Sequence, residues 1–460
     1  MKARRARAWV AGVALALAAA AAGGAETVSL DEAVARALAA DQRIGERRHL
    51  VEAARALLQE ALGHRGLRYD VNAFVGIAPG VDGGFFKAPN GESCTSLPCT
   101  PRDDLYRLND GLSPWLSVQF KIIKPLYTFG KIERYAEAAQ GNVDVKRQDV
   151  RLVRAEVRWD VTRAYYGYLA ARDMRRLLED VDRRIGKALR LVERWLKEGG
   201  GRAKRSDLYA LQTGQALARR FLAQARGVEA VALDGLKVLT GVGLEAELAV
   251  ADRELRPVPL PEGRLRELIA RALERRPEMA QLEAGMRARR ALVAARKAEA
   301  RPDVYAGVVG SLSWSPNRDR LDNPYLIDPF NHAGATPVLG LKWEFVSDVQ
   351  PARVARARAE LEALVAKASF AREGIPFQVA EAWHKVRAGR RQVEELERAS
   401  RAARRWLITA YADFEAGLER TERLVDAFQA YVFAHSDYLM AVHDYDLAVA
   451  HLERVTGAWE

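Results

Sequence analysis

The feature that most constrains this chain is an internal repeat with a very long period. The segment from Gly201 to Gly241 aligns without a gap with the segment from Gly417 to Gly457, at an offset of 216 residues (417 − 201). Both segments begin with a glycine and end in Thr-Gly. A period far above the roughly 20–50 residues of solenoid repeats indicates a duplicated architecture rather than a repeat array. We therefore predict that the chain consists of two copies of one long unit.

The N-terminus predicts a secretory signal peptide over residues 1–25. A basic segment, an apolar stretch and the small residues Gly23-Gly24-Ala25 follow one another in that order. The apolar stretch is shorter than the roughly 20 residues that a spanning helix needs. We expect an exported protein whose first repeat covers 26–255 and whose second repeat covers 263–460, joined by a proline-rich linker at 256–262.

The charge of the chain argues against a nucleic-acid partner. The formal net charge is +11, and it falls to about +7 once the four basic residues of the signal segment are removed (11 − 4). Spread over a chain with 29% charged residues, this excess is typical of a solvated surface. Export also separates the protein from cytoplasmic nucleic acid, so we expect none as a partner.

The only cysteines, Cys94 and Cys99, lie close together in a loop. In an oxidising compartment such a pair favours a local disulfide. A metal site is the weaker alternative, because it would need further ligands and no histidine lies near the pair in the sequence. We expect neither a metal site nor a cofactor.

The pattern of apolar residues predicts the same order of elements in both repeats: helix, strand, loop, strand, long helix, tight turn, helix. In the long helix of the first repeat and in the last helix of the second, from Leu424 to Leu452, the residues of one stripe recur at alternating spacings of three and four, which is typical of a coiled-coil seam. The first repeat is predicted to have helices at about 30–64, 131–197 and 206–240, strands at 68–77 and 114–122, and a loop at 79–112. The second is predicted to have helices at about 262–300, 352–410 and 421–456, strands at 303–314 and 337–347, and a loop at 315–335.

The four predicted strands raise the possibility of a membrane protein. Their apolar positions alternate over about ten residues, a length that crosses a bilayer when the strand is tilted. Four strands are too few to close a barrel, and open sheet edges are not tolerated in lipid. If these strands enter a membrane, several chains must share one barrel. The alternative is a small soluble sheet that caps a helical bundle.

Three features, in this order behind a signal peptide, carry a resemblance to a known family. They are the opening Val28-Ser-Leu-Asp-Glu-Ala-Val-Ala-Arg-Ala-Leu38, the strand-to-helix segment Lys124-Pro-Leu-Tyr-Thr-Phe-Gly-Lys131, and the two turn-and-helix segments that end in Thr-Gly. Together they make the chain resemble the TolC-like outer-membrane efflux proteins over nearly all of its mature length.

The resemblance implies a fold that is mainly α with a small β part. It implies a homotrimer with a duplicated long-helix coiled-coil tunnel, to which each chain adds four strands of a shared transmembrane β-barrel. The barrel would lie among the lipids of the cell outer membrane and the tunnel would extend into the periplasm. A periplasmic adaptor and an inner-membrane transporter would deliver substrates to this passive duct, for efflux or for type I secretion.

The resemblance also places a gate and adaptor contact at the two periplasmic helix turns. In the first repeat these positions match Gly201, Asp207 and Leu208, and in the second they match Gly417, Arg420, Arg423, Leu424 and Asp426. Acids commonly ring the pore in the second repeat, so Arg423 departs from the pattern. Asp207 would pair with Arg423 or Arg420 of a neighbouring rod as a latch. The alternative is that these residues are solvated helix-start positions.

No catalytic motif is visible, so we expect no enzyme activity. Metalloprotease, phosphate-loop and nucleophile-elbow patterns are absent from the sequence, and the seven histidines are scattered along it. The competing interpretation is a periplasmic coiled-coil scaffold or adaptor without a pore. Adaptors usually carry one helical hairpin between β-rich modules, whereas two hairpins are predicted here.

Overall fold

The computed structural model describes residues 26–82, 86–87, 89, 97–101, 107–199, 202–316, 328–344 and 347–459. The predicted signal peptide, Cys94 and Gly201 lie outside these residues. Cys99 is disulfide-bonded. The described residues form two compact units, and both repeats contribute to each unit. One unit contains the residues up to Leu50, Lys146–Leu282 and the residues from Lys367 onward, and the other contains Val51–Val145 and Glu283–Ala366.

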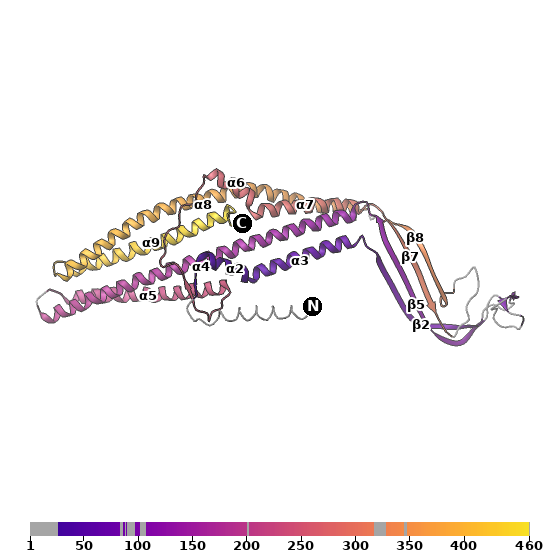
Figure 1. The fold of residues 1–460 in the computed structure, drawn as a ribbon, viewed down its shortest axis with the longest axis horizontal. Coiled ribbons are helices and arrows are strands. Elements are labelled where there is room, and N and C mark those ends of the chain that lie inside the picture. The colour runs from indigo at the N-terminus through magenta and orange to yellow at the C-terminus, as the bar shows by residue number, and fades with distance from the viewer. Residues whose placement is uncertain are drawn as a thin grey trace, which may run out of the picture. The chain divides into compact units, whose positions relative to one another are not determined.

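Long helices make up most of the chain (Figure 1). The helices predicted at 131–197, 206–240 and 421–456 are confirmed, each with ends within one residue of the prediction. In the part of the chain that the structure describes, each helix is either too short or too polar to span a lipid bilayer. In chain order the helices are α2 (Leu30–Ala40), α3 (Gln42–Gly63), α4 (Lys131–Glu198), α5 (Arg205–Thr240), α6 (Leu265–Arg275), α7 (Pro277–Ala298), α8 (Val349–Glu415) and α9 (Thr421–Val455).

Two helices that were predicted to be continuous are each broken once. The predicted helix at 30–64 ends at Asp41, where the backbone is extended and the carboxylate Oδ1 accepts the N–H of Arg43 at 2.8 Å. A short acidic side chain that bonds its own backbone in this way competes with the helical hydrogen bond. The predicted helix at 262–300 breaks at Arg276, because Pro277 disfavours the helical conformation in the residue before it.

The Thr-Gly pairs that revealed the repeat end equivalent helices. Thr240 ends α5, and its hydroxyl donates to the carbonyl oxygen of Leu236 at 2.8 Å. Thr456 follows the last residue of α9, and its hydroxyl donates to the carbonyl oxygen of Leu452 at 2.8 Å. In both helices the threonine hydroxyl therefore bonds the carbonyl four residues earlier, in the last turn of the helix.

The linker between the repeats is bound to α4 by charged side chains. The guanidinium of Arg172 donates to the carbonyl oxygen of Asp252 at 2.7 Å. The carboxylate of Asp173 accepts the N–H of Leu255 at 2.6 Å, and both residues are buried. Hydrogen bonds to charged groups are worth about 1.5–3 kcal/mol each. We call residues 251–261 the strap, because they are held along this helix instead of forming a free linker.

The second unit contains one antiparallel sheet with the strand order β2-β5-β7-β8 (Figure 1). The strand predicted at 303–314 is confirmed. The loop predicted at 79–112 is wrong at both ends, because the hydrogen-bonded ladder between the two strands beside it continues until Asp82 pairs with Arg107. The strand predicted at 337–347 is also misplaced, because pairing with β7 fixes its bounds. The four strands are β2 (Arg68–Asp82), β5 (Arg107–Tyr127), β7 (Asp303–Trp314) and β8 (His332–Lys342). The shorter pairs are β1 (Glu26–Val28) with β6 (Leu248–Val250) and β3 (Phe86–Lys87) with β4 (Thr100–Pro101).

The register separates this sheet into a polar and an apolar face. Partners across the ladder share a face, and successive side chains alternate between faces. On the polar face the hydroxyl of Ser313 donates to that of Ser117 at 2.9 Å, and Ser311 bonds to His332 at 2.7 Å. This face also carries Asp70, Asn72, Gln119, Lys121 and Thr336, with the apolar Phe74, Val309 and Val338 among them. The other face is apolar and carries Tyr69, Val71, Val75, Ile77, Leu116, Val118, Phe120, Val308, Leu312, Leu339 and Leu341.

One close helix contact in the second unit leads to a test. A Cβ added at Gly141 in α4 would lie 2.6 Å from the Cβ of Ala288 in α7. We expect Gly141→Ala to lower the free energy of unfolding by about 1–3 kcal/mol, although alanine is the better helix former. The control is Gly235→Ala in α5, where nothing lies within 4 Å, and it should be neutral or stabilising by up to about 1 kcal/mol. Chemical denaturation measures both, and equal effects would contradict the expected overlap.

Candidate functional site

The turn between α8 and α9 is fixed by backbone hydrogen bonds. Gly417 has a φ of 75°, which an L side chain rarely adopts. Its N–H donates to the carbonyl oxygen of Phe414 at 3.0 Å, and the N–H of Leu418 donates to that of Asp413 at 2.9 Å. This pair of bonds is a Schellman motif, which satisfies carbonyls at the end of α8. The predicted site residue Gly417 therefore defines the turn.

The following helix starts differ between the two repeats at Asp207 and Arg423, which are equivalent positions. In α5 the carboxylate of Asp207 accepts the N–H of Lys204 at 2.7 Å, so the acid caps its own helix. The guanidinium of Arg423 carries only hydrogen-bond donors, so it cannot accept a backbone N–H at the start of α9. There the carboxylate of Glu419 accepts the N–H of Arg420 at 3.0 Å. In the second repeat the capping carboxylate therefore belongs to Glu419, which precedes α9, and Arg423 has no capping role.

The predicted charged residues of the second turn all lie at the surface. Arg420, Arg423 and Asp426 are exposed, whereas Asp207 is half-buried. Among the described residues no ion pair joins Asp207 to Arg420 or Arg423. Two arginines at the start of α9 are also unfavourable for the helix dipole, which prefers anions there. Stability of the helix therefore does not account for Arg423.

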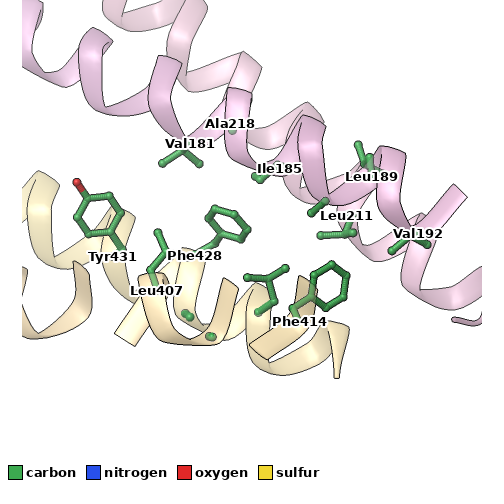
Figure 2. Close-up of a cluster of buried hydrophobic side chains, with 14 of the residues drawn as sticks. Val181, Ile185, Leu189, Val192, Leu211, Ala218, Leu407, Phe414, Phe428 and Tyr431 are labelled. Atoms are coloured by element: carbon green, nitrogen blue, oxygen red, sulfur yellow. The ribbon is translucent and has the colours of Figure 1, made fainter. Parts of the chain in front are cut away.

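The two predicted leucines belong to an apolar cluster behind the turns (Figure 2). Leu424 is completely buried, and Leu208 is partly buried against the same cluster. The rings of Trp195 and Phe414 pack with their centroids 5.2 Å apart. The cluster joins both hairpins through Val181, Ile185, Leu189 and Val192 of α4, Leu211 and Ala218 of α5, Leu407 of α8, and Phe428 and Tyr431 of α9. Both turns are thus anchored by a leucine that packs in one shared apolar cluster.

The seam predicted along α9 is a packing interface, as its histidine shows. The ring of His435 stacks between Tyr431 and Tyr438, with centroids 5.5 and 5.9 Å away, and its Nδ1 bonds to the hydroxyl of Ser400 at 2.8 Å. Burial, which disfavours the charged imidazolium, lowers the pKa of His435 below its usual range. The ring is a neutral, hydrogen-bonded part of the core.

An apolar groove beside this cluster was not predicted from the sequence. It has a volume of about 650 Å³ and is formed by α4, α5 and α9. Phe433 is 68% exposed in it, and Phe221, Val228 and Met440 are also exposed. These residues lie outside the buried seams of their helices. Large apolar side chains at positions outside a seam are the sequence feature from which the groove could have been predicted. An exposed apolar groove of this kind marks an interaction surface.

Comparison with known proteins shows which proteins the chain resembles. Residues 268–458 match the family described as "Outer membrane efflux protein". Protein CyaE of Bordetella pertussis (strain Tohama I) is 28% identical over 332 residues, which are 71% of this chain and 66% of that protein. The chain thus spans just under two thirds of this relative. The outer-membrane channel OprN superposes with a TM-score of 0.73 at 18% identity, covering 93% of this chain and 89% of that one. The Campylobacter jejuni CmeC outer membrane channel gives 0.74 at 13%, covering 93% and 85%.

The chain is similar to outer membrane efflux proteins in sequence over residues 268–458 and has the fold of solved outer-membrane channels over 93% of its length. The predicted fold class, mainly long helices with a small four-stranded β part, is confirmed. The solved proteins OprN and CmeC are outer-membrane channels, in agreement with the predicted location in the outer membrane. The family transports substrates and is not a class of enzymes.

The exchange of capping residues can be tested by placing an acid at position 423. Glu419→Ala removes the acceptor for the N–H of Arg420 and should destabilise the start of α9 by about 1 kcal/mol. Adding Arg423→Asp restores an acid at the position that Asp207 occupies in α5, and it should recover most of that loss. Hydrogen exchange of the amides around the turn measures both changes. If the effects of Glu419→Ala and Arg423→Asp on stability simply add, an acid at position 423 does not replace Glu419 as the cap, and the prediction is wrong.

Proposed function

We propose that this chain is one subunit of a homotrimeric exit duct in the outer membrane. The duct passively releases substrates that a periplasmic adaptor and an inner-membrane pump deliver for efflux or secretion. The observation that carries the proposal is the two-faced sheet, because its apolar face suits lipid and its polar face suits a water-filled lumen. The proposal assigns the chain no catalytic chemistry.

The edges of the sheet support an assembly of several chains. β2 pairs only with β5, and β8 pairs only with β7, within the described residues. Each unpaired edge leaves backbone donors and acceptors that lipid cannot satisfy, at a cost of several kcal/mol per group. In a trimer, β8 of one chain would pair with β2 of the next, and about twelve strands would close a barrel.

The apolar groove supports the same assembly in the helical part. Phe433 and its neighbours form an apolar surface that a second copy of the chain would cover, in the helical wall of the trimer. We expect Phe433→Glu to reduce the fraction of trimer at least tenfold, because burying an unpaired carboxylate is costly. The control, Leu418→Glu, introduces the same charge at the exposed turn. Light scattering of the detergent-solubilised protein measures the mass, and trimers of unchanged stability would contradict this use of the groove.

The two helix turns are proposed to form the periplasmic gate and the contact with the adaptor. Three copies of Arg423 beside Asp426 would give the pore a ring of mixed charge, which should weaken cation selectivity. Asp207 uses one carboxylate oxygen for its cap, and the latch would use the other on Arg423 or Arg420 of a neighbouring rod.

The latch predicts a change in conductance. The double variant Asp207→Ala with Arg423→Ala should raise the single-channel conductance of trimers in planar bilayers. Arg423→Glu should raise it as well, because two carboxylates then face each other. The control is Asp234→Ala, an exposed acid on α5. Unchanged conductance in both gate variants would refute the latch and leave the duct itself untouched.

The duct as a whole is tested by fractionation. We expect heat-modifiable trimers in the outer-membrane fraction and discrete conductance steps after reconstitution. Recovery of the chain as a soluble periplasmic monomer would instead favour a scaffold or adaptor without a pore. Crosslinking from the two turns would then identify the adaptor, and the sensitivity of a deletion strain would identify the substrate class.

A further inference from the structure

A buried carboxylate in α9 occupies an unusual position under the strap. Asp446 is 1% exposed, and its Oδ1 accepts the N–H of Val258 at 2.9 Å. Its other oxygen, Oδ2, meets no hydrogen-bond donor among the described residues. A buried charged group usually has all its acceptors occupied, because an unpaired one costs at least about 1–3 kcal/mol. Asp446 therefore has spare capacity to bind a donor.

This carboxylate lines a pocket of about 430 Å³ between α2, α4, α9 and the strap. Such a volume is in the range of small-molecule sites. Asp31 and Glu453 contribute two further carboxyls to the lining, and Arg158 contributes the one guanidinium. The apolar walls come from Val34, Pro259, Leu260, Pro261 and Val449.

The ionisable groups around Asp446 make the pocket electronegative. Arg158 lies over the ring of Trp459, 5.1 Å from its centroid, and the indole N–H of Trp459 donates to Glu453 at 2.9 Å. Burial raises the pKa of Tyr166 above its usual range, and the nearby carboxylates of Asp446, Asp252, Glu453 and Asp31 raise it further. Three carboxyls against one guanidinium leave the lining with an excess of acid.

We propose that this pocket binds a small organic cation, a protonated amine or a guanidinium, whose N–H donates to Oδ2 of Asp446 and whose apolar part packs on the strap. A metal ion fits less well, because no group of three or more acids, histidines or cysteines is placed to hold one among the described residues. The site is distinct from the proposed gate and groove. A bound cation would add a contact between the strap and α9, so it should tighten the connection between the repeats.

The pH dependence of binding follows from the burial of the acid. Burial disfavours the charged carboxylate and raises the pKa of Asp446 to about 7. The carboxylate that attracts a cation is therefore formed as the pH rises through 7. Between pH 6 and pH 8 the affinity for a cation should increase roughly tenfold, which is the change in the ionised fraction.

Titration calorimetry of the solubilised full-length protein tests the site, with benzylammonium chloride as the probe. We expect one site per chain, at least tenfold weaker binding in Asp446→Asn, and no measurable binding of the neutral benzyl alcohol. The matched control is Asp444→Asn, an acid two residues away whose side chain is 73% exposed, which should bind like the wild type. Asp31→Asn, at an exposed position, should weaken binding about three-fold and provides a second variant if Asp446→Asn does not fold.

Four results would overturn the proposal. These are equal binding of benzyl alcohol, full affinity in a folded Asp446→Asn, affinity that does not rise with pH, and an equal Asp446-dependent heat from magnesium chloride. The first three would make the pocket merely apolar, and the fourth would make it a metal site. None of these measurements depends on conductance, so the site and the duct are tested separately.

Discussion

The helical unit depends on apolar burial between its two hairpins. The 68 residues of α4 cannot bury their own apolar stripe, so the helix needs a partner along its length. Each buried Val, Leu or Phe of the shared cluster contributes about 1.5–3 kcal/mol. The exposed ion pairs along α8, such as Arg390 with Glu394, contribute about 0–1 kcal/mol each. The seam therefore decides how the hairpins pack, and the charges mainly keep the outer surface soluble.

The features that depend on a periodic pattern of apolar residues could be predicted from the sequence, whereas the features that depend on contacts between distant segments could not. The seams of α4 and α9 were readable because burial follows a helical spacing. The bounds of β8 were not readable, because pairing of Asp303 with Lys342 sets its end. The breaks at Asp41 and Arg276 were local and could have been found from Asx capping and from Pro277. The positions of the two turns were readable from the sequence, and their role as a gate stays a prediction. The packing of Leu208 and Leu424 in the cluster and the contacts of Glu419 and Phe433 were missed, because they depend on contacts in space.

The repeat explains why one pair of positions is informative. The two hairpins start in equivalent ways but differ in which acid caps the helix. In the first copy Asp207 does this, and its charge is partly committed to the backbone. In the second copy Glu419 accepts the N–H at the helix start, so position 423 can carry the opposite charge at the surface without loss of the cap. Arg423 is therefore the position at which the two turns differ most in charge, although both helix starts are capped.

The same duplication creates a problem that the strap resolves. Two hairpins joined by a free linker could separate, because exposed segments lose little when they move. Arg172 and Asp173 hold the strap on α4, and Asp446 holds it on α9. An aliphatic side chain at position 446 would lose less solvation free energy on burial, but it could not accept the N–H of Val258. The carboxylate thus costs desolvation to make a connection between the repeats. Because that connection uses only one of the two carboxylate oxygens, a small ligand or a proton on the other oxygen would act directly on the contact between the strap and α9.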